Sequence, residues 1–484
     1  MATKAKQAKA PRIPVGDAVR AQWPFFDRLS SSAQRTLVAR YKAANAPAAA
    51  PAPAAAPPAV PAAAAPLTTP LPANIRVNDP GEDTGSGNQT TQSEPSIAVH
   101  HKKVVVGYND SSFAPNYTGY SNSANGGHSF HDRGGLTGNQ SGDNVLDANR
   151  HGHFYYATLS TDGAGNSSVG VCKSTDGGVT FTPPVNASTT ANGPAFFQDK
   201  EWLAVDRTEE ASDGNIYIAW TKFAPVGEQI FFARSTDGGN TWSAPLALSP
   251  VGNPQGAIIA IAPEGDIFVC WLDRGTSQIF VTRSQDAGLT FANPVPGNAP
   301  VQNIIQIPGT MNGNIRANSF PSIAIDQDDG QVYITYSSQV GPDHADVFLT
   351  VSKDHGKTWS APVRVNDDAT HTDQWMPSVA VTDEGTVGVM FYDRRNDPAN
   401  LNIDVYLGIS TNHGKSFHSN QRITTTPFPP AVNFDPVIAW NYMGDYNQMV
   451  AEDERFYMVW GDNRDTVGAR HDPNVYFAVF DVDD

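Results

Sequence analysis

The sequence contains few cysteines and no long apolar run. Only two of the 484 residues are cysteine, Cys172 and Cys270, and each lies inside a short apolar segment. A small buried side chain is the common role of such a residue, so we expect neither a disulfide framework nor a cysteine metal site. No segment approaches the ~18 continuous apolar residues of a membrane span.

The N-terminus lacks the apolar core of a classical secretion signal. Its first residues, MATKAKQAKAPRIPVGDAVRAQWPFF, are basic and contain no apolar core of about 7 to 15 residues. We therefore expect no Sec export, which leaves the cytoplasm or a non-classical export route as the alternative locations.

Positive charge is scarce outside residues 1 to 43. This segment contains nine Lys and Arg and two Asp, so it carries +7 of a net charge of −17 and leaves −24 for the remainder. Such a remainder repels nucleic acid and anionic membranes. We expect no nucleic-acid partner.

The chain divides into three regions. Residues 1 to 43 contain the aromatic cluster WPFF and the segment SAQRTLVARYKAAN, in which Ser31 or Ser32 can cap a short helix. This region is interpreted either as a docking tag for a protein partner or as a disordered tail. Residues 44 to 72 are almost entirely Pro and Ala, which favours an extended spacer. Residues 73 to 484 form the third region.

The third region contains a sixfold repeat. Short β-branched and aromatic runs alternate with Gly, Asp and Asn turns, and segments with helical periodicity are absent, so we expect an all-β region. One octapeptide recurs as SANGGHSF from Ser123, STDGGVTF from Ser174, STDGGNTW from Ser235, SQDAGLTF from Ser284, SKDHGKTW from Ser352 and STNHGKSF from Ser410.

The octapeptide has the chemistry of a tight turn. Its Asp or Asn can cap its own backbone, its Gly allows a positive φ, its hydroxyls satisfy turn amides, and its aromatic residue packs inward. We therefore interpret its acids as turn residues and not as catalytic or calcium-binding carboxylates.

Seven pairs of strand-like segments accompany the six octapeptides. They span 95–110, 144–160, 201–222, 257–274, 321–338, 377–395 and 446–464. Seven pairs predict a seven-bladed β-propeller with turns of the octapeptide type; six blades are the alternative. The segment PANIRVNDP at 72–80 matches SAPVRVNDD at 360–368, so residues 73 to 79 are expected to form the outer strand of the last blade and to close the ring.

The octapeptides are similar to Asp boxes, and QSEPSIAV, DKEWLAVD, FYDRRND and GDYNQMV resemble bacterial Asp-box (BNR) repeat proteins of the sialidase, or neuraminidase, superfamily. The resemblance covers residues 73 to 484. It implies a glycoside hydrolase acting on terminal sugars of glycans, with three arginines that hold a sialic acid carboxylate, a tyrosine nucleophile assisted by a glutamate, and an aspartate as acid/base. The alternative is a non-catalytic propeller that binds glycan or protein and is attached to a larger assembly by its N-terminal segment.

The resemblance directs attention to the starts of the innermost strands and the ends of the second strands. Catalytic roles are expected for Tyr446, Glu94, Glu201, Asp110 and Asp199. Substrate binding is expected for Arg274, Arg316, Arg394, Arg464 and Asp373. The family's Arg-Ile-Pro motif occurs only at residues 12 to 14, ahead of the spacer, so one arginine of the clamp is unassigned.

Each of these residues also has a purely structural interpretation. Tyr446 is the expected nucleophile, with Glu94 or Glu201 as its base, but it is alternatively a packing residue with a polar tip. The Asp-Arg pairs are alternatively salt bridges between blades. A solvated acidic rim is the alternative for Asp199, Glu201 and Asp373.

No metal or cofactor site is expected. His151 and His153 have no clear third ligand, and an exposed turn explains them better. The acidic turn DQDDG at 326–330 lacks the spacing and final glutamate of an EF-hand loop.

Removal of residues 1 to 72 should leave the propeller folded, because the spacer isolates it from the N-terminal region. Removal of residues 1 to 82 should lower the melting temperature, because the closing strand is lost. Thermal unfolding of both truncated proteins measures the difference, and aggregation of the shorter truncation would show that residues 1 to 72 belong to the fold.

Overall fold

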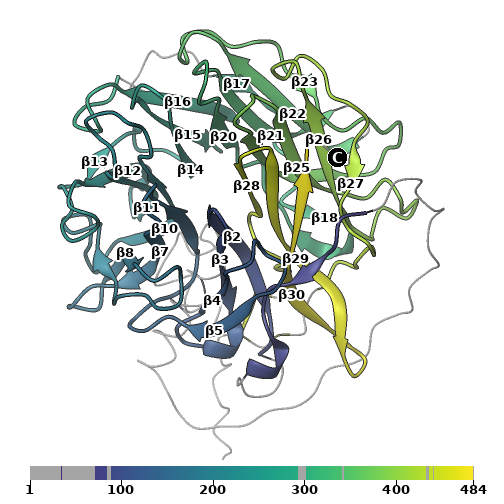
Figure 1. The fold of residues 1–484 in the computed structure, drawn as a ribbon, viewed down its shortest axis with the longest axis horizontal. Helices are drawn as coiled ribbons and strands as arrows, with labels where there is room; N and C mark the ends of the chain where they lie inside the picture. The colour runs from purple at the N-terminus through teal and green to yellow at the C-terminus, as the bar shows by residue number, and fades with distance from the viewer. Residues whose placement is uncertain are drawn as a thin grey trace, which may run out of the picture.

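The protein is a seven-bladed β-propeller. A computed structural model describes residues 71–83, 89–292, 301–340, 343–431, 435, 437–439 and 441–482, together with Gln34 and Leu37. Seven four-stranded antiparallel sheets surround a common axis (Figure 1). The prediction of seven blades is confirmed. Of the expected N-terminal helix only Gln34 and Leu37 are described, both helical and the latter buried; the rest of that helix and the spacer to residue 70 lie outside the described residues.

The first four blades follow one another along the chain, each from its inner to its outer strand. Blade 1 contains β2 (Gln92–His100), β3 (Lys103–Asp110), β4 (Thr118–Ser123) and β5 (His131–Gly135). Blade 2 contains β6 (Val145–Ala148), β7 (Phe154–Thr161), β8 (Ser167–Ser174) and β9 (Val185–Asn186). Blade 3 contains β10 (Phe197–Val205), β11 (Ile216–Ala224), β12 (Gly227–Ser235) and β13 (Leu246–Ala247). Blade 4 contains β14 (Pro254–Ile261), β15 (Ile267–Asp273), β16 (Gln278–Ser284) and β17 (Gln302–Asn303).

The last three blades complete the ring. Blade 5 contains β20 (Ser322–Ile325), β21 (Val332–Val340), β22 (Asp343–Ser352) and β23 (Val363–Arg364). Blade 6 contains β24 (Gln374–Val381), β25 (Val387–Asp393), β26 (Asp404–Ser410) and β27 (Gln421–Arg422). Blade 7 contains β28 (Gln448–Glu452), β29 (Arg455–Val467), β30 (Arg470–Asp481) and, outermost, β1 (Ile75–Arg76).

Small elements occur outside the blades. A two-stranded sheet of β18 (Thr310–Met311) and β19 (Ile315–Arg316) precedes blade 5. The 3-10 helices of the described part of the chain are η2 (Pro80–Glu82), η3 (Ser111–Phe113) and η4 (Asn312–Asn314). Within the described ranges, no helix has both the length and the apolar character needed to cross a membrane.

Aromatic pairs hold the second and third strands of blades 3 to 7 together. In each pair the two rings lie on directly opposite residues, with centroids 6.0 to 6.4 Å apart. The pairs are Trp220–Phe231, Trp271–Phe280, Tyr336–Phe348, Phe391–Tyr406 and Trp460–Tyr476. Cross-strand aromatic pairs of this kind stabilise a sheet by about 0.2–1 kcal/mol each.

Each octapeptide forms the turn between the third and fourth strands of its blade. In the turn from Ser235, the Ser235 hydroxyl donates to Asp237 Oδ1 (2.8 Å) and accepts from Gly239 N (2.9 Å). Asp237 accepts from Thr241 N (2.9 Å) and Thr241 Oγ1 (2.6 Å). The equivalent backbone contact recurs in the other five turns. These acids are therefore turn residues, as expected.

The glycine at the fifth position of the turn also joins neighbouring blades. A Cβ at Gly178 would lie 2.2 Å from Val105 in the preceding blade, and one at Gly414 would lie 2.5 Å from Leu349. Both glycines have a positive φ, 78° and 72°. A larger residue would therefore clash as well as strain the backbone.

The N-terminal strand closes blade 7, as expected, although the strand itself covers only two of the predicted residues 73 to 79. Ile75 pairs with Phe477 and Arg76 with Tyr476 in β30. Val77 N then donates to Val475 O (2.9 Å).

The RVND match between residues 76–79 and residues 364–367, at the outer strands of blades 7 and 5, has a structural basis. Asn78 Oδ1 accepts from Val475 N (2.9 Å), and Asn366 Oδ1 accepts in the same way from Val347 N (3.0 Å). The shared asparagine thus extends the outer strand by one side-chain hydrogen bond to the third strand.

Asp237→Ala should lower the free energy of unfolding by about 1–2 kcal/mol, because both turn bonds to Thr241 lose their acceptor. Asp237→Asn should cost little, since Asn412 accepts from Ser416 N (3.0 Å) in the equivalent turn. Urea or thermal unfolding of the two variants measures the difference. An unchanged melting temperature in Asp237→Ala, combined with a loss of ligand binding or activity, would contradict the structural role.

Candidate functional site

Four inner strands contain a β-bulge at the same position. The first residue of the bulge is Glu94 in β2, Lys200 in β10, Gly256 in β14 and Met376 in β24, and φ is positive at all four, from 53° to 73°. Asp143, just before β6, has φ 59°. A positive φ costs a non-glycine residue on the order of 1–3 kcal/mol and often marks a functional site. Blades 1 to 3 therefore each hold a charged side chain at a strained position.

Glu94 is the most densely contacted of these residues. It is fully buried and accepts from the Tyr442 hydroxyl in a short hydrogen bond, from Asn109 Nδ2 (2.5 Å) and from Asp445 N (3.0 Å). Its carboxyl also hydrogen bonds with that of Asp143. Burial raises the pKa of Glu94 well above its usual value, and the charges of Asp143 and Asp445 raise it further.

Tyr442 lies between Glu94 and a buried ion pair. The Arg316 guanidinium is 5.4 Å from the Tyr442 ring centroid and forms a short ion pair with Asp445. Asn318 Nδ2 donates to Asp445 O (3.0 Å). Burial raises the pKa of the Tyr442 phenol, as do the neighbouring carboxylates, while Arg316 lowers it. The phenol thus has a carboxyl acceptor on one side and a cation on the other.

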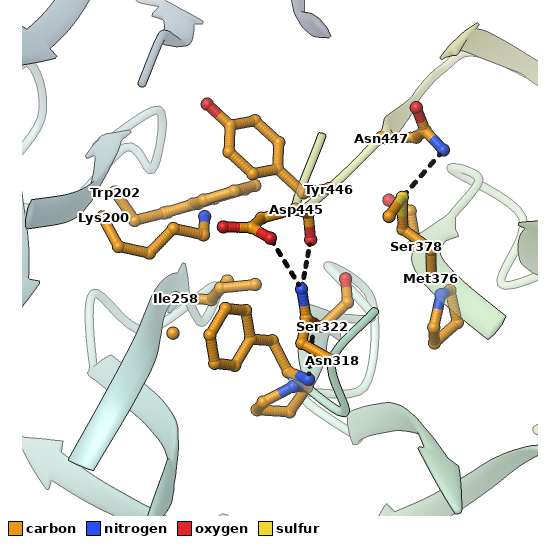
Figure 2. Close-up of a pocket in the computed structure, with 14 residues that line it drawn as sticks. Lys200, Trp202, Ile258, Asn318, Ser322, Met376, Ser378, Asp445, Tyr446 and Asn447 are labelled. Carbon is orange, nitrogen blue, oxygen red and sulfur yellow. Dashed lines mark hydrogen bonds between the residues drawn. The ribbon is translucent and has the colours of Figure 1, made fainter. Parts of the chain in front are cut away.

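Lys200 lies between two aromatic rings. Its Nζ is 3.8 Å from the Tyr446 centroid and 5.1 Å from the Trp202 centroid, and Figure 2 shows it pointing toward Asp445. This nitrogen has no hydrogen-bond partner in the described part of the chain. Burial lowers the pKa of Lys200, against the attraction of the surrounding carboxylates. The Tyr446 hydroxyl donates to Asn144 O (2.9 Å).

The cavity beside Lys200 is small. Lys200, Tyr446, Asn318 and Met376 are among its lining residues (Figure 2). The space open to the centre of a water molecule is about 20 Å³. Because one water needs about 10–15 Å³ by this measure, the cavity admits a water and not a sugar ring.

Glu201 and Asp199 are buried beside this cluster. Neither carboxyl oxygen of Glu201 has a hydrogen-bond partner among the described residues. Asp199 Oδ2 accepts from Gln255 Nε2 (3.2 Å). Neither residue is part of a solvated acidic rim, because both side chains are fully buried; that structural alternative is wrong for them.

Arg394 and Asp373 form their own buried pair. Arg394 Nη1 is 3.4 Å from Asp373 Oδ2, and Arg394 Nη2 donates to Asn312 O (2.9 Å). The guanidinium also lies 4.7 Å from the Trp375 ring centroid. Asp373 is buried too, so the interpretation of it as a rim residue is also wrong.

Arg464 and Arg274 likewise contact carboxylates of the protein itself. The Arg464 guanidinium donates two hydrogen bonds to Asp462, of 3.0 and 2.6 Å. Arg274 Nη2 is 3.4 Å from Glu228 Oε2. Of the four expected arginines, Arg316 is the one that contacts the Tyr442 ring.

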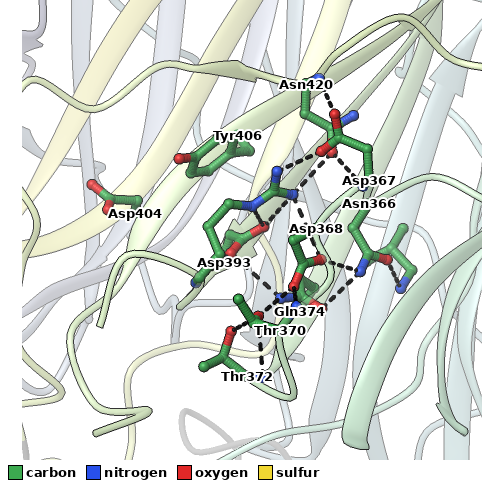
Figure 3. A network of polar contacts seen from close by, with 12 residues as sticks. Asn366, Asp367, Asp368, Thr370, Thr372, Gln374, Asp393, Asp404, Tyr406 and Asn420 are labelled. Atoms are coloured by element: carbon green, nitrogen blue, oxygen red, sulfur yellow. Dashed lines mark hydrogen bonds and ion pairs between the residues drawn. The ribbon is translucent and has the colours of Figure 1, made fainter. Parts of the chain in front are cut away.

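Asp393 and Arg395, from the FYDRRND segment, belong to a network that joins blades 5 and 6. Arg395 forms an ion pair with Asp393 (2.7 Å) in its own blade and with Asp367 (2.5 Å) in the connection from blade 5 (Figure 3). The salt-bridge interpretation of this pair is confirmed.

Asp110 serves a local structural purpose. Its Oδ1 accepts from Ser112 N (2.8 Å) and Ser112 Oγ (2.6 Å), so it caps η3. Burial raises its pKa to about 6, although the bonds from Ser112 lower it.

Two groups of potential metal ligands lie at blade junctions, away from the axis. One consists of Glu264, Asp266 and His355, and the other of Asp326, Asp329 and His413. Each combines an inner hairpin turn with the histidine of an octapeptide turn in the next blade. The sequence analysis missed this pairing because residues about 90 positions apart meet there. His151 and His153 belong to neither group.

Tyr442 is the main residue that the sequence analysis missed. It lies four residues before Tyr446 in the same NYMGDYN segment, so a second tyrosine beside the expected one was the available signal. The contact expected between Glu94 and Tyr446 is made by Glu94 and Tyr442.

Comparisons with known proteins show the fold. No protein-family profile and no curated protein matches the sequence. An ulvan lyase bound to -[GlcA(1-4)Rha3S]- has a TM-score of 0.52 at 10% identity, over 82% of this chain and 94% of that one. A Hadza microbial sialidase has a TM-score of 0.46 at 17% identity, over 66% of each chain. An α-L-arabinanase from Penicillium chrysogenum has a TM-score of 0.45 at 12% identity, over 86% of this chain and 99% of that one. These matches share a propeller fold and do not single out sialidases.

Glu201→Gln should raise the melting temperature more at pH 8 than at pH 5. Burial, and then the charge of Asp143, raise the pKa of Glu201 well above its usual value, so the folded protein holds this proton more tightly than the unfolded chain. The stability from this proton is complete below the unfolded-state pKa and declines as the pH rises toward the folded-state pKa. Glutamine is neutral throughout and escapes this loss.

Melting curves at both pH values measure the effect, with Glu209→Gln as a control at an exposed side chain. An increase in melting temperature that is equal at both pH values, or that the control variant reproduces, would refute the interpretation that folded Glu201 retains a proton.

Proposed function

We propose that this propeller is a glycoside hydrolase for glycans with an acidic sugar, and that Tyr442 and Glu94 carry its chemistry. The observation that carries the proposal is the hydrogen bond from the Tyr442 phenol to the buried Glu94 carboxyl at the propeller axis. A tyrosine paired with a glutamate is the arrangement that the sialidase resemblance implies for a nucleophile and its base.

The proposed reaction has two steps. The Tyr442 oxygen attacks the anomeric carbon while its proton passes to Glu94, and the leaving glycosidic oxygen takes a proton from a second carboxyl. Asp143 supports that second role because its carboxyl contacts that of Glu94. Water then cleaves the glycosyl–tyrosine bond and returns the protons.

Two cations support an acidic sugar as the substrate. Arg316 lies against the Tyr442 ring, and Lys200 points toward Asp445 with an Nζ that has no hydrogen-bond partner among the described residues. A guanidinium and an ammonium are the groups that recognise a carboxylate. The ulvan lyase that shares the fold is bound to a glycan containing glucuronate, which is also acidic.

A non-catalytic glycan-binding or protein-binding propeller is the second candidate, and the covering of the cluster favours it. Ser111 Oγ donates to Asp435 Oδ2 (2.6 Å), and Arg316 N donates to Asn441 O (2.7 Å). Glu94 and Tyr442 are themselves buried, and the cavity beside Lys200 admits a water and not a sugar ring, so a sugar reaches Glu94 only if this part of the protein opens. A binding function on the outer surface requires no such opening.

Tyr442→Phe should reduce kcat by about 10³-fold or more, because the nucleophilic oxygen is lost while the ring remains against Arg316. Tyr446→Phe is the matched control: it loses only a hydrogen bond to a main-chain carbonyl and should keep kcat within about tenfold. A screen of fluorogenic glycosides, sialosides and uronides first, supplies the substrate for both measurements.

The reverse result would make Tyr446 the nucleophile and refute the assignment of Tyr442. If no glycoside is cleaved while a glycan array shows binding, the second candidate replaces the first.

A further inference from the structure

A cleft opens between blades 4 and 5, beside the octapeptide turn of blade 5. Its lining includes Phe268, Val281, Arg283, His355, Lys357 and Trp359. The space open to the centre of a water molecule is about 680 Å³. Small-molecule sites commonly have about 300–1,000 Å³, so the cleft has room for a short oligosaccharide. No described residue lines both this cleft and the cavity beside Lys200.

The cleft lies where an aromatic contact of other blade junctions cannot form. At three junctions the octapeptide aromatic packs edge to face against a ring on the third strand of the preceding blade. These pairs, with their centroid distances, are Tyr120–Phe181 (5.2 Å), Phe232–Phe291 (4.7 Å) and Phe477–Phe130 (5.1 Å). The residue of blade 4 at this position is Val281, which faces Cys270 as Phe232 faces Ala219. Valine has no ring to place against Trp359, and the space between them is open.

Arg283 is held in a fixed position at the edge of the cleft. Its Nε donates to Asp266 Oδ2 (2.7 Å), its Nη2 forms a short ion pair with the same carboxylate, and its guanidinium carbon lies 5.6 Å from the Phe268 ring centroid. Glu264 Oε1 lies 3.8 Å from Arg283 Nη2 and 2.8 Å from His355 Nδ1. None of these contacts uses Arg283 Nη1, which leaves that nitrogen as a donor for a ligand.

The charged side chains that line the cleft are basic. They are Arg283, Lys357 and, when it is protonated, His355, and no Asp or Glu occurs among the described lining residues. Lys357 is exposed and has no ion-pair partner in the described part of the chain. Basic side chains beside an aromatic ring, on an otherwise strongly acidic propeller, are complementary to an anionic ligand.

We propose that this cleft binds an acidic oligosaccharide, with one sugar ring against Trp359 and a carboxylate of the sugar on Arg283 Nη1 and Lys357. The exposed Gln285 amide can exchange hydrogen bonds with sugar hydroxyls. The anionic character of the ligand follows from the lining, whereas the choice of a glycan rests on the proposed function. A polymer long enough to reach both the cleft and the Glu94 cluster is then held at two places, which raises its overall affinity.

Calorimetric titration of the full chain tests the proposal with short oligomers of galacturonate, alginate and sialic acid. At least one of these acidic probes should bind with a Kd below about 1 mM. The affinity should fall several-fold as NaCl is raised, because salt screens the attraction between exposed charges. A neutral cello-oligosaccharide of the same length should bind at least tenfold more weakly.

Trp359→Ala and Val281→Phe should each weaken binding of the acidic probe at least tenfold. The first variant removes the ring, and the second fills the cleft with the side chain that blade 3 has at Phe232. Trp242→Ala is the matched control, because it removes the octapeptide tryptophan of blade 3, and it should leave the affinity within about twofold. Lys357→Gln should weaken binding of the acidic probe and reduce its salt dependence.

Circular dichroism and the melting temperature check that each variant is folded. Absence of binding by every acidic probe at about 5 mM, equal binding of the neutral probe, or equal weakening by Trp242→Ala would overturn the proposal. Loss of binding in Arg316→Ala but not in Trp359→Ala would place the probe at the Glu94 cluster and also overturn it. Tighter binding of ATP or of a polyglutamate peptide would overturn the choice of a glycan.

The two proposals fail in different ways. If the protein cleaves no glycoside but binds an acidic probe in a manner that depends on Trp359, the glycosidase proposal is wrong and the cleft is still a glycan site. If glycosides are cleaved and Val281→Phe and Trp359→Ala bind the acidic probes as the unaltered protein does, the cleft is not a site.

Discussion

The pairing of β1 with β30 is the constraint on which the rest of the molecule depends. Each blade packs only against its neighbours, so an open ring would expose an edge strand and one face of a blade. The closing strand consists of two residues, and hydrogen bonds from neighbouring side chains add to its attachment. Asn78 accepts from Val475 N, and Arg464 Nη1 donates to Asn74 Oδ1 (3.1 Å), while Asn74 Nδ2 donates to Ile423 O (2.9 Å) in blade 6. Arg464 thus contributes to closure, which explains why its guanidinium is saturated by protein atoms.

The closed ring fixes the inner strands tightly enough to maintain their strained bulges. Two residues oppose one at each bulge, and the first of them has a positive φ. Blade 4 has Gly256 there and blade 6 has Met376, neither of them charged, whereas Glu94, Asp143 and Lys200 occupy consecutive blades. The charged bulge residues therefore lie on the side of the ring formed by blades 1 to 3. Tyr442, Arg316 and Asp445 approach it from the segments before blades 5 and 7.

The sequence could predict the fold because its signals are local. An octapeptide carries all the hydrogen-bonding groups of its own turn, and the RVND match carries the asparagine that bonds to the third strand. The ends of the strands were also predictable: Glu94 lies in the inner strand β2, and Arg316 and Tyr446 lie shortly before the inner strands β20 and β28. Their partners were not predictable. A bulge inserts one extra residue and reverses the alternation of side chains, so sequence parity cannot tell Lys200 from Glu201. Tyr442 lies in an irregular segment whose path depends on contacts with blade 1 and β19.

The protonation of the buried carboxyl groups around Glu94 would depend on whether an anionic ligand is bound. Among the described residues, Glu94, Asp143, Glu201 and Asp445 have Lys200 and Arg316 as their neighbouring cations. Two cations do not balance four carboxylates, so protons balance part of the charge, in agreement with the raised pKa values of Glu94 and Glu201. A substrate carboxylate would add one more negative charge and would strengthen that proton binding. The base role of Glu94, however, requires its ionised form. The anion must therefore be neutralised by Lys200 and Arg316 before Glu94 can accept the Tyr442 proton, which makes these two cations as necessary to the proposed chemistry as the tyrosine itself.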